Sequence, residues 1–177
     1  MENKKENVLF SKEQIAERIA EVAKVISKDY SGRKLYVLSL LRGSFIFAAD
    51  LVREITVPVN IGFMSTSSYG HGEVSTGDVQ VVQDISDNIE GYDVLIVDDI
   101  VDTGTTMRFV KEYLAKGNPA SIKSCVLLDK PSRRKVEIQP DYTCFKIDDL
   151  FVVGYGLNYG DYYRNIPYVF NWESESE

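Results

Sequence analysis

The segment from Val94 to Met107 constrains the fold more than any other part of the chain. It begins with four uninterrupted apolar residues, which are typical of a strand buried on both faces in a parallel sheet. Asp98 and Asp99 follow where this strand is expected to end, and Asp102 comes shortly after them. A Gly/Thr loop and a stretch with helical spacing complete the pattern. The segment therefore predicts a strand–loop–helix unit of an α/β protein.

The loop over 103–106 has the composition of a phosphate-binding turn. Its glycine and threonines offer backbone N–H groups and hydroxyls at the start of a helix, where the helix dipole favours an anion. Ligands of open α/β sheets bind outside the carboxyl ends of the strands. Acids beside such a loop would repel a phosphate unless they bind sugar hydroxyls or a divalent cation. Together with Asp98 and Asp99, the loop predicts a site for a sugar phosphate and a metal ion.

The remaining chain alternates between predicted strands and helices. A capping box at Ser11–Gln14 starts an amphipathic helix over 12–28, and helices are also expected from about 45 to 54 and over 105–116. Strands are expected over 35–41, 57–63, 79–85, 94–97 and 122–128, with shorter ones at 145–147, 151–153 and, at a sheet edge, 168–170. This order predicts a central parallel sheet flanked by helices, in a single domain over residues 1–177.

Composition narrows the class of protein. A net charge of −7 argues against a general nucleic-acid binder. No apolar stretch of the sequence approaches the roughly 20 residues that cross a bilayer, and the first residues lack a signal-peptide apolar region. Cys125 and Cys144 lie in apolar, strand-like surroundings without CxxC spacing, so we expect both to be reduced. These features predict a cytoplasmic protein without nucleic-acid or membrane partners.

Other known signatures match this sequence only in part. The central segment lacks the lysine of a Walker loop and the acid spacing of an EF-hand. The pair Gly154 and Gly156 lacks the third glycine of a dinucleotide fingerprint. The triplet Asp102–Gly104 is that of aspartic proteases, which need two copies. A symmetric dimer would supply the second copy, but the helical pattern and the adjacent acids fit an all-β protease poorly.

Five separated motifs resemble those of type I phosphoribosyltransferases, and most closely the bacterial hypoxanthine-guanine branch of that family. They are LLRGSF at 40–45, SYGHGEVSTGD at 68–78, VLIVDDIVDTGTTM at 94–107, LLDKPSRR at 127–134 and FVVGYGLNYGDYYRNIPY at 151–168. The resemblance implies a parallel-sheet core with a small hood formed by terminal segments. It also implies Mg²⁺-dependent transfer of the phosphoribosyl group of phosphoribosyl pyrophosphate to hypoxanthine or guanine, giving IMP or GMP, by a homodimer or homotetramer.

In the central motif, the resemblance assigns a role to each polar residue. Asp98 and Asp99 would bind the ribose hydroxyls directly or through Mg²⁺, and the 5′-phosphate would be held by Thr103, Gly104, Thr105 and Thr106. Asp102 would be the general base for the proton on purine N7. An alternative is that Asp102 only caps the turn that follows.

The pyrophosphate contacts implied by the resemblance come from two distant segments. Leu41, Arg42 and Gly43 match a loop whose first peptide bond is commonly cis, and its amides would meet the pyrophosphate. Arg164 matches a second pyrophosphate contact, for which a guanidinium is well suited. The alternative for Arg42 is a solvent-facing residue at the start of a helix.

For the purine, the resemblance implies three contacts. Lys130 would read the exocyclic oxygen, Phe151 would stack on the ring, and Val152 would contact the purine edge through its backbone. A lysine in solvent and a phenylalanine in the core are the structural alternatives. These residues favour a 6-oxopurine and do not rank hypoxanthine, guanine and xanthine.

Two further features bear on the chemistry. The polar, Gly-rich segment over 65–78 predicts either a mobile loop, in which Ser68 and Tyr69 close over the reaction centre, or a plain hairpin connection. Asn158 stands where the family usually has an aspartate that helps to hold the second metal. An amide oxygen still coordinates Mg²⁺, but without the charge, and Asp161 is an alternative ligand.

Two alternative functions remain at this stage. One is a transferase that prefers xanthine or a pyrimidine. The other is a non-catalytic regulator that senses nucleotides on the same fold and binds DNA or RNA. The absence of a helix-turn-helix extension, the negative charge and the presence of Asp102 weigh against the regulator.

Overall fold

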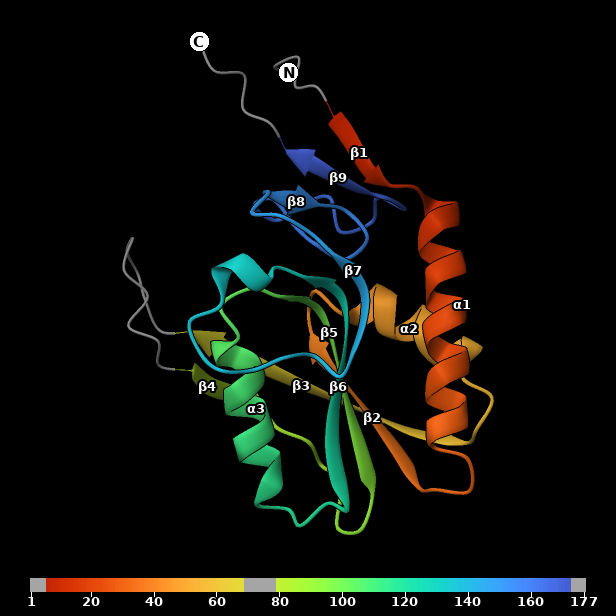
Figure 1. Ribbon diagram of the computed structural model, residues 1–177. Coiled ribbons are helices and arrows are strands. Elements are labelled where there is room, and N and C mark those ends of the chain that lie inside the picture. Colours follow the sequence, from red (N-terminus) through yellow and green to blue (C-terminus); the bar gives the residue numbers. More distant parts are fainter. Residues whose placement is uncertain (1–5, 69–78, 173–177) are drawn as a thin grey trace.

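In the computed structural model, a six-stranded sheet forms the centre of the molecule (Figure 1). Five of its strands are parallel to one another. The structure describes residues 6–68 and 79–172. The strands, in spatial order, are β4 (Val79–Gln83), β3 (Val59–Ser68), β2 (Leu35–Leu41), β5 (Asp93–Val101), β6 (Ser121–Asp129) and β7 (Tyr142–Lys146). Only β4 is antiparallel to its neighbour. The predicted α/β fold with a central parallel sheet is confirmed.

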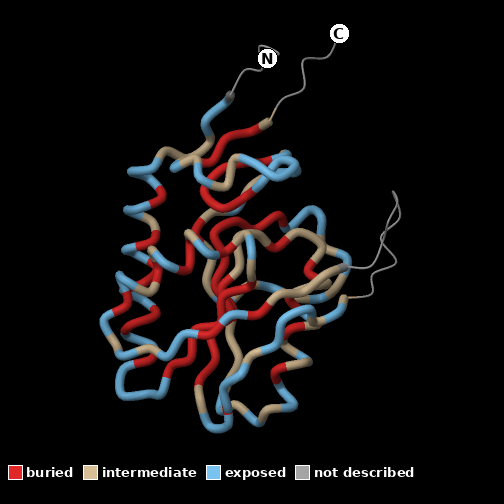
Figure 2. Tube along the Cα trace, turned by 180° about the vertical axis from the view of Figure 1, so that it is seen from behind, coloured by how far each residue is buried: buried red, intermediate tan, exposed pale blue. Residues whose placement is uncertain are grey.

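Helices cover both faces of this sheet, as the periodic sequence requires. Since strand side chains alternate between faces, Leu35 and Val37 pack with α1 (Lys12–Asp29) and α2 (Phe45–Glu54), whereas Tyr36 and Leu38 pack with α3 (Thr105–Ala115). Figure 2 shows the buried residues gathered along the strands and the exposed ones on the outer sides of the helices. The capping box predicted at the start of α1 is present.

A second, three-stranded sheet, called the hood here, lies above the carboxyl ends of the central strands (Figure 1). It is antiparallel and contains β1 (Glu6–Phe10), β9 (Val169–Trp172) and β8 (Val152–Val153) in that order. Stacking of Phe10 on Phe145, with ring centroids 4.0 Å apart, joins it to β7. The predicted hood is confirmed, but the edge position predicted for its last strand is wrong. The strand β1 was not predicted, and it pairs with the free side of β9.

The central strand β5 is longer than predicted, which changes the position of the acidic pair. We expected the strand to end before Asp98, but it continues to Val101. Its pairing with β2 ends at Val97, whereas its pairing with β6 continues, with Asp98 opposite Val126 and Val101 opposite Asp129. The two acids therefore lie in the part of β5 that no longer pairs with β2 but still pairs with β6.

The two cysteines agree with the expectation drawn from their apolar surroundings. Both cysteines are free and buried, and burial raises the pKa of the Cys144 thiol to about 12. Among residues 6–68 and 79–172, none of the helices combines the length and the apolar character that a membrane crossing needs.

Candidate active site

The candidate site lies at the carboxyl ends of β2, β5 and β6, where the loops after these strands meet. A cavity of about 230 Å³ opens along the end of β5 and the first turn of α3. Its lining consists of Asp98, Asp99, Ile100, Val101, Asp102, Thr103, Gly104, Thr106 and Met107. The structure therefore brings the acids and the threonine loop of the central motif to one hollow, as expected for a ligand site of a parallel sheet.

The threonine loop presents hydrogen-bonding groups at the start of α3. Thr103 Oγ1 lies 3.2 Å from Thr105 Oγ1 and accepts from the Thr105 N–H at 3.4 Å. Gly104 precedes the helix with φ of 84°, and a Cβ there would lie 2.5 Å from Ile138 Cγ2, so glycine is required. Gly104, the N-cap residue of α3, has no side chain that could cap the helix. Its first N–H groups are suited to an anion.

Asp98 and Asp99 form a crowded, half-buried pair of carboxylates. Asp98 Oδ1 accepts from the Asp99 N–H at 3.0 Å, and Asp99 Oδ1 accepts from the Ile100 N–H at 2.8 Å. Burial raises the pKa of both carboxyls, and the charge of Asp99 raises the pKa of Asp98 further. The nearby Arg164 acts in the opposite direction on the pKa of Asp99. Such a pair is suited to hydroxyl groups or to a divalent cation.

The loop after β2 reaches Asp99 directly. The Leu41–Arg42 peptide bond is cis, as predicted. Ser44, fully buried, holds the loop by donating to the Leu40 carbonyl at 2.6 Å. A Cβ on Gly43 would lie 1.9 Å from Asp99 Oδ2, so a side chain there would displace the carboxylate. Arg42 is exposed.

The segment after β8, which comes from the hood, contacts the loop after β2 beside Asp99. A Cβ on Gly156 would lie 2.2 Å from the Gly43 carbonyl oxygen, so the two backbones are in contact. Gly156 donates its N–H to the Arg164 carbonyl at 2.9 Å, and Arg164 returns a bond from Nη1 to the Gly156 carbonyl at 2.6 Å. Residues 41–43, Asp99 and Arg164, which are far apart in the sequence, therefore meet at one place.

Asp102 is partnered by an arginine that the sequence analysis did not single out. Arg133 Nε donates to Asp102 Oδ1 at 3.1 Å, and Arg133 Nη1 donates to Asp149 Oδ2 at 3.3 Å. The residue before α3 is Gly104. The carboxylate of Asp102 is thus held by an ion pair and not by the capping role considered above.

The structural alternatives for Lys130 and Phe151 do not hold, because the lysine is not in solvent and the phenylalanine is not in the core. The Lys130 side chain is only 10% exposed, and its Nζ lies 3.8 Å from Asp149 Oδ1. Phe151 is 52% exposed, in edge contact with Tyr159 at a centroid distance of 5.9 Å. Val152 is buried in β8. A buried ammonium and an open aromatic face thus belong to adjoining segments at the carboxyl end of the main sheet.

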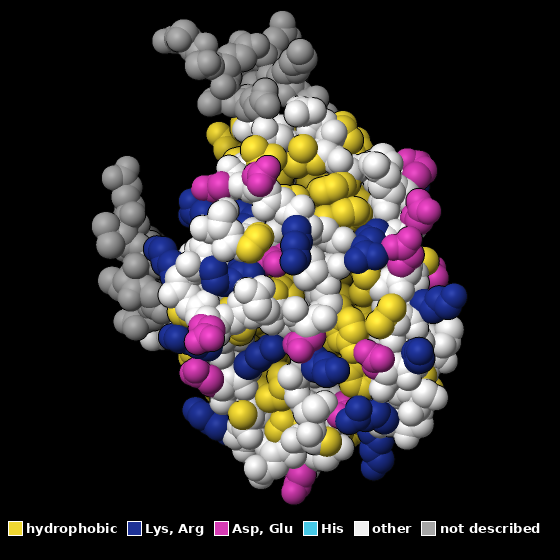
Figure 3. Space-filling view, viewed as in Figure 1, with side chains coloured by type: hydrophobic (Ala, Val, Ile, Leu, Met, Phe, Trp, Pro, Cys, Tyr) yellow, Lys and Arg dark blue, Asp and Glu magenta, His cyan; other side chains and the backbone are white. Residues whose placement is uncertain are grey.

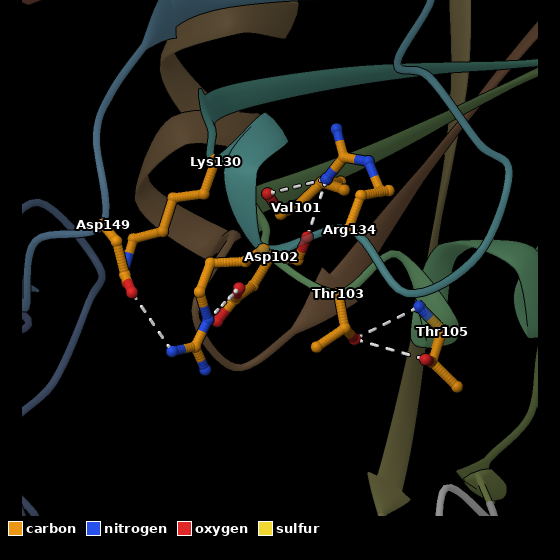
Figure 4. Close-up of polar contacts among 8 residues, drawn as sticks. Val101, Asp102, Thr103, Thr105, Lys130, Arg134 and Asp149 are labelled. Atoms are coloured by element: carbon orange, nitrogen blue, oxygen red, sulfur yellow. Dashed lines mark hydrogen bonds and ion pairs between the residues drawn. The ribbon is translucent and has the colours of Figure 1, made fainter.

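Arg134 joins the ends of β5 and β6 and was also missed. It donates from Nη1 to the Asp102 carbonyl at 2.7 Å and to the Val101 carbonyl at 3.3 Å, and it pairs with the buried Asp129 through Nη2. Figure 4 shows Lys130 and Asp149 on one side of Asp102 and Arg134 on the other. The signal was the pair of adjacent arginines three and four residues after Lys130, in a segment interpreted only through its lysine.

Of the remaining predicted site residues, Asn158 and Ser68 are described and Tyr69 is not. Asn158 is exposed, and its amide nitrogen donates to the Gly160 carbonyl at 2.6 Å. Ser68 is the last residue of β3, and Tyr69 lies outside the described residues. Among the residues described, no three His, Cys, Asp or Glu side chains gather into a metal-binding group. Any cation would therefore need ligands from substrate or water in addition to the two acids.

On the described part of the face in Figure 3, Lys and Arg are interspersed with Asp and Glu. A stripe of positive charge, as in a general nucleic-acid binder, is not seen in that view.

Comparison with known proteins agrees with this geometry. Residues 8–160 match the family model described as phosphoribosyl transferase domain. The hypoxanthine phosphoribosyltransferase of Salmonella typhimurium is 47% identical over 164 residues, which cover 92% of each chain. The hypoxanthine-guanine phosphoribosyltransferase of Aquifex aeolicus is 46% identical over 94% of each chain. A crystal structure of a hypoxanthine phosphoribosyltransferase from Staphylococcus aureus, 42% identical, superposes with a TM-score of 0.91 over 94% of this chain and 91% of that one. The chain therefore belongs to the phosphoribosyltransferase family.

Proposed function

We propose that this protein is a purine salvage enzyme that transfers the phosphoribosyl group of phosphoribosyl pyrophosphate to hypoxanthine or guanine. The products are IMP or GMP and pyrophosphate. The observation that carries the proposal is the meeting of three features: the acidic pair beside the uncapped start of α3, the cis loop against Asp99, and the buried Lys130 next to the segment of Phe151. The names of the relatives support the same activity.

The phosphoribosyl group would be bound along the end of β5. The N–H groups and hydroxyls of residues 103–106 would hold the 5′-phosphate, because they lie at the positive end of α3. Asp98 and Asp99 would accept hydrogen bonds from the ribose hydroxyls. The pyrophosphate would then lie between Gly43 and Arg164, where backbone N–H groups and a guanidinium are present.

The purine would lie between the hood and the end of β6. Phe151 offers an open face for stacking, and Lys130 offers a donor for the oxygen at C6. The backbone of residues 151–153 is held by pairing of β8 with β9 and by the Trp172 N–H bond to the Phe151 carbonyl at 2.8 Å. This pairing would keep the purine edge against a fixed strand.

The transfer would form the bond between purine N9 and the anomeric carbon with the N9 electron pair. The bond from that carbon to the pyrophosphate oxygen breaks, and its electron pair leaves with pyrophosphate. The proton on N7 passes to the carboxylate of Asp102, which acts as the general base. The transition state has oxocarbenium character, so the acids of β5 and the donors at the pyrophosphate corner stabilise opposite charges.

Mg²⁺ is part of the proposal because the donor set suits it. Mg²⁺ prefers carboxylate oxygens together with substrate phosphates and water, and Asp98 and Asp99 supply the carboxylates. When bound, Mg²⁺ would neutralise charge on the leaving pyrophosphate. Asn158 is the further ligand we propose, and Asp161 is its alternative.

The decisive experiment measures pyrophosphate release with hypoxanthine, guanine and xanthine, with and without Mg²⁺. We expect turnover with hypoxanthine or guanine that depends on Mg²⁺. In the Asp102→Asn variant, turnover should fall at least about 100-fold, the scale of general acid–base catalysis. Tight nucleotide binding without turnover on any purine would contradict the proposal and favour a nucleotide sensor. Faster turnover with xanthine than with hypoxanthine or guanine would show that xanthine is the preferred substrate.

The metal ligand at position 158 has its own test. If Asn158 binds Mg²⁺, the Asn158→Asp variant gains a charged ligand, and its apparent Mg²⁺ affinity in the turnover assay should rise. The matched Asp161→Asn variant should leave that affinity unchanged. Equal affinity in wild type and Asn158→Asp, with a loss in Asp161→Asn, would move the ligand to Asp161.

The proposal also includes a cytoplasmic homodimer or homotetramer with no nucleic-acid or membrane partner. Its support is the family resemblance, together with the mixed charges of the face in Figure 3. Sedimentation of the purified chain measures the oligomeric state.

A further inference from the structure

Four charged side chains of alternating sign form a row beside the candidate base. Arg133 Nε lies 3.1 Å from Asp102 Oδ1, and Arg133 Nη1 lies 3.3 Å from Asp149 Oδ2. Asp149 Oδ1 in turn lies 3.8 Å from Lys130 Nζ. The row therefore runs from the proposed general base to the proposed purine-reading lysine through two residues without a role so far.

The local fold explains why Arg133 reaches Asp102. It ends η1 (Pro131–Arg133), the short helical turn that follows β6, and its N–H donates to the Lys130 carbonyl at 3.2 Å. This turn directs the chain back toward β5, to which the Lys130 N–H is bonded through the Val101 carbonyl at 2.9 Å. Arg133 and Lys130 thus start from one turn, and Asp149 approaches both from the segment that leads to the hood.

The contact with Asp102 uses only one carboxylate oxygen. Arg133 bonds to Oδ1, and among the described residues Oδ2 has no hydrogen-bond partner. A carboxylate free to rotate about χ2 presents either oxygen in many directions. One held at Oδ1 presents Oδ2 in a single direction. Positioning of this kind contributes to rate when a proton has to move over a short distance.

The contact is not needed for the fold. The side chains of Arg133, Asp102 and Asp149 are 48%, 38% and 54% exposed. Ion pairs this open to water contribute little to stability. The charge of Asp102, followed by the bond to Asp149, raises the pKa of Arg133, so the guanidinium stays charged at all ordinary pH values. An exposed, permanently charged arginine between two acids is therefore better explained by the site than by the core.

We propose that Arg133 is a positioning residue for Asp102, and that Asp149 holds Arg133 in place from the side of the hood. Arg133 fixes Oδ1 so that Oδ2 faces the purine N7 proton. Asp149 also contacts Lys130. It therefore keeps the distance between the Lys130 ammonium, which reads the purine oxygen, and the Asp102 carboxylate, which takes the proton, constant. This inference rests on the proposed function, since it assigns Arg133 to the same reaction.

The test compares Arg133→Gln, Arg133→Lys and Asp149→Asn by steady-state kinetics. In Arg133→Gln we expect kcat to fall about 10-fold, because a misaligned base costs rate, while KM for phosphoribosyl pyrophosphate stays unchanged. Arg133→Lys keeps the charge and should recover part of the loss. Asp149→Asn should show a smaller fall. The matched control is Arg108→Gln, which removes an equally exposed arginine from α3, where it pairs with Glu112 at 3.8 Å.

A double-mutant cycle with Asp102→Asn separates positioning from direct substrate contact. If Arg133 acts through Asp102, Arg133→Gln has no further effect in the Asp102→Asn background. An equal loss in both backgrounds, or a kcat for Arg133→Gln that matches wild type, overturns the inference. A wild-type protein that releases no pyrophosphate with any purine contradicts the proposed function itself, and this is measured before any variant is compared.

Discussion

The two halves of the candidate site are built in different ways. The half proposed for ribose and phosphate comes from one continuous segment, Asp98 to Thr106, at the end of β5. The half proposed for the purine combines Lys130 from the main sheet with Phe151 and Val152 from the hood. A continuous segment keeps its geometry through its own strand and helix. A half made from two sheets depends on the contacts that join them.

Arg134 is the residue on which that junction depends most. It is 11% exposed and bonds to the Val101, Asp102 and Ile138 carbonyls as well as to the buried Asp129. It therefore ties the end of the ribose-phosphate half to β6, the strand that ends directly before Lys130. Changes at this residue should affect both halves.

The largest expected effect is that of Arg134→Met. The substitution leaves the Asp129 carboxylate, 1% exposed, without its counter-charge. Breaking a buried pair in this way costs about 3–5 kcal/mol of unfolding free energy. Urea denaturation measures it.

A double variant, Arg134→Met with Asp129→Asn, sharpens this prediction. Removing the unpaired charge should recover at least half of the lost stability, whereas kcat should stay low because the Asp102 carbonyl is no longer held. A double variant as unstable as the single one would show that the charge is not the cause.

Gly104→Ala tests the turn that belongs to the ribose-phosphate half. The left-handed backbone at φ of 84° costs about 1–2 kcal/mol for a residue with a Cβ. Crowding against Ile138, Arg134 and Val136 adds about 1–3 kcal/mol. We also expect KM for phosphoribosyl pyrophosphate to rise, because the turn that presents the 5′-phosphate donors shifts.

The matched control is Gly32→Ala. Gly32 has φ of 74° but nothing within 4 Å of a Cβ, so only the backbone cost applies. Equal losses of unfolding free energy in the two variants would mean that the contact with residues 134–138 does not constrain the loop.

Phe151→Ala tests the purine half. Loss of stacking on a base costs about 1–3 kcal/mol, so KM for the purine should rise by about 5-fold to 150-fold. KM for phosphoribosyl pyrophosphate should not change, and the melting temperature should change little because the ring is 52% exposed. Thr105→Val is the converse variant, with an effect on phosphoribosyl pyrophosphate alone. If each variant moved both KM values together, the division into two halves would be wrong.

The smallest expected effect is the pH dependence of stability at Asp98. Burial and the charge of Asp99 raise the folded pKa of Asp98 above its ordinary value of 3.8. The stability associated with the protonated carboxyl is thus complete below pH 3.8 and is lost as the pH rises through the folded pKa. Asp98→Asn cannot ionise, so at pH 7 without divalent cations its Tm should exceed that of wild type.

The difference in Tm should disappear on approach to pH 3.8. Each kcal/mol gained corresponds to about 2–4 °C for a chain of this size. Asp99 acts on the Asp98 carboxyl, and Arg164 acts on Asp99, so both residues are kept unchanged in the comparison. A variant less stable than wild type at pH 7 would show that the Asp98 carboxylate contributes net stability to the fold.

Local patterns explain which elements were predictable from the sequence. The capping box of Ser11 and Gln14 is satisfied within one turn, so the start of α1 needs no information from elsewhere. The threonine loop and the start of α3 are equally local. By contrast, the end of β5 depends on how far β6 continues to pair, and the central position of β9 depends on β1, at the other end of the chain.

The sequence by itself determined the parallel-sheet architecture and the strand–loop–helix order of residues 94–107, because periodicity and turn chemistry act over a few neighbouring residues. Only the tertiary structure decided that Arg133 and Arg134 hold Asp102. Their partners lie at the ends of β5 and β6 and in the segment before the hood, and no spacing along the chain encodes which strand ends become neighbours. Pairing of β5 with β6 brings those charges within hydrogen-bond distance.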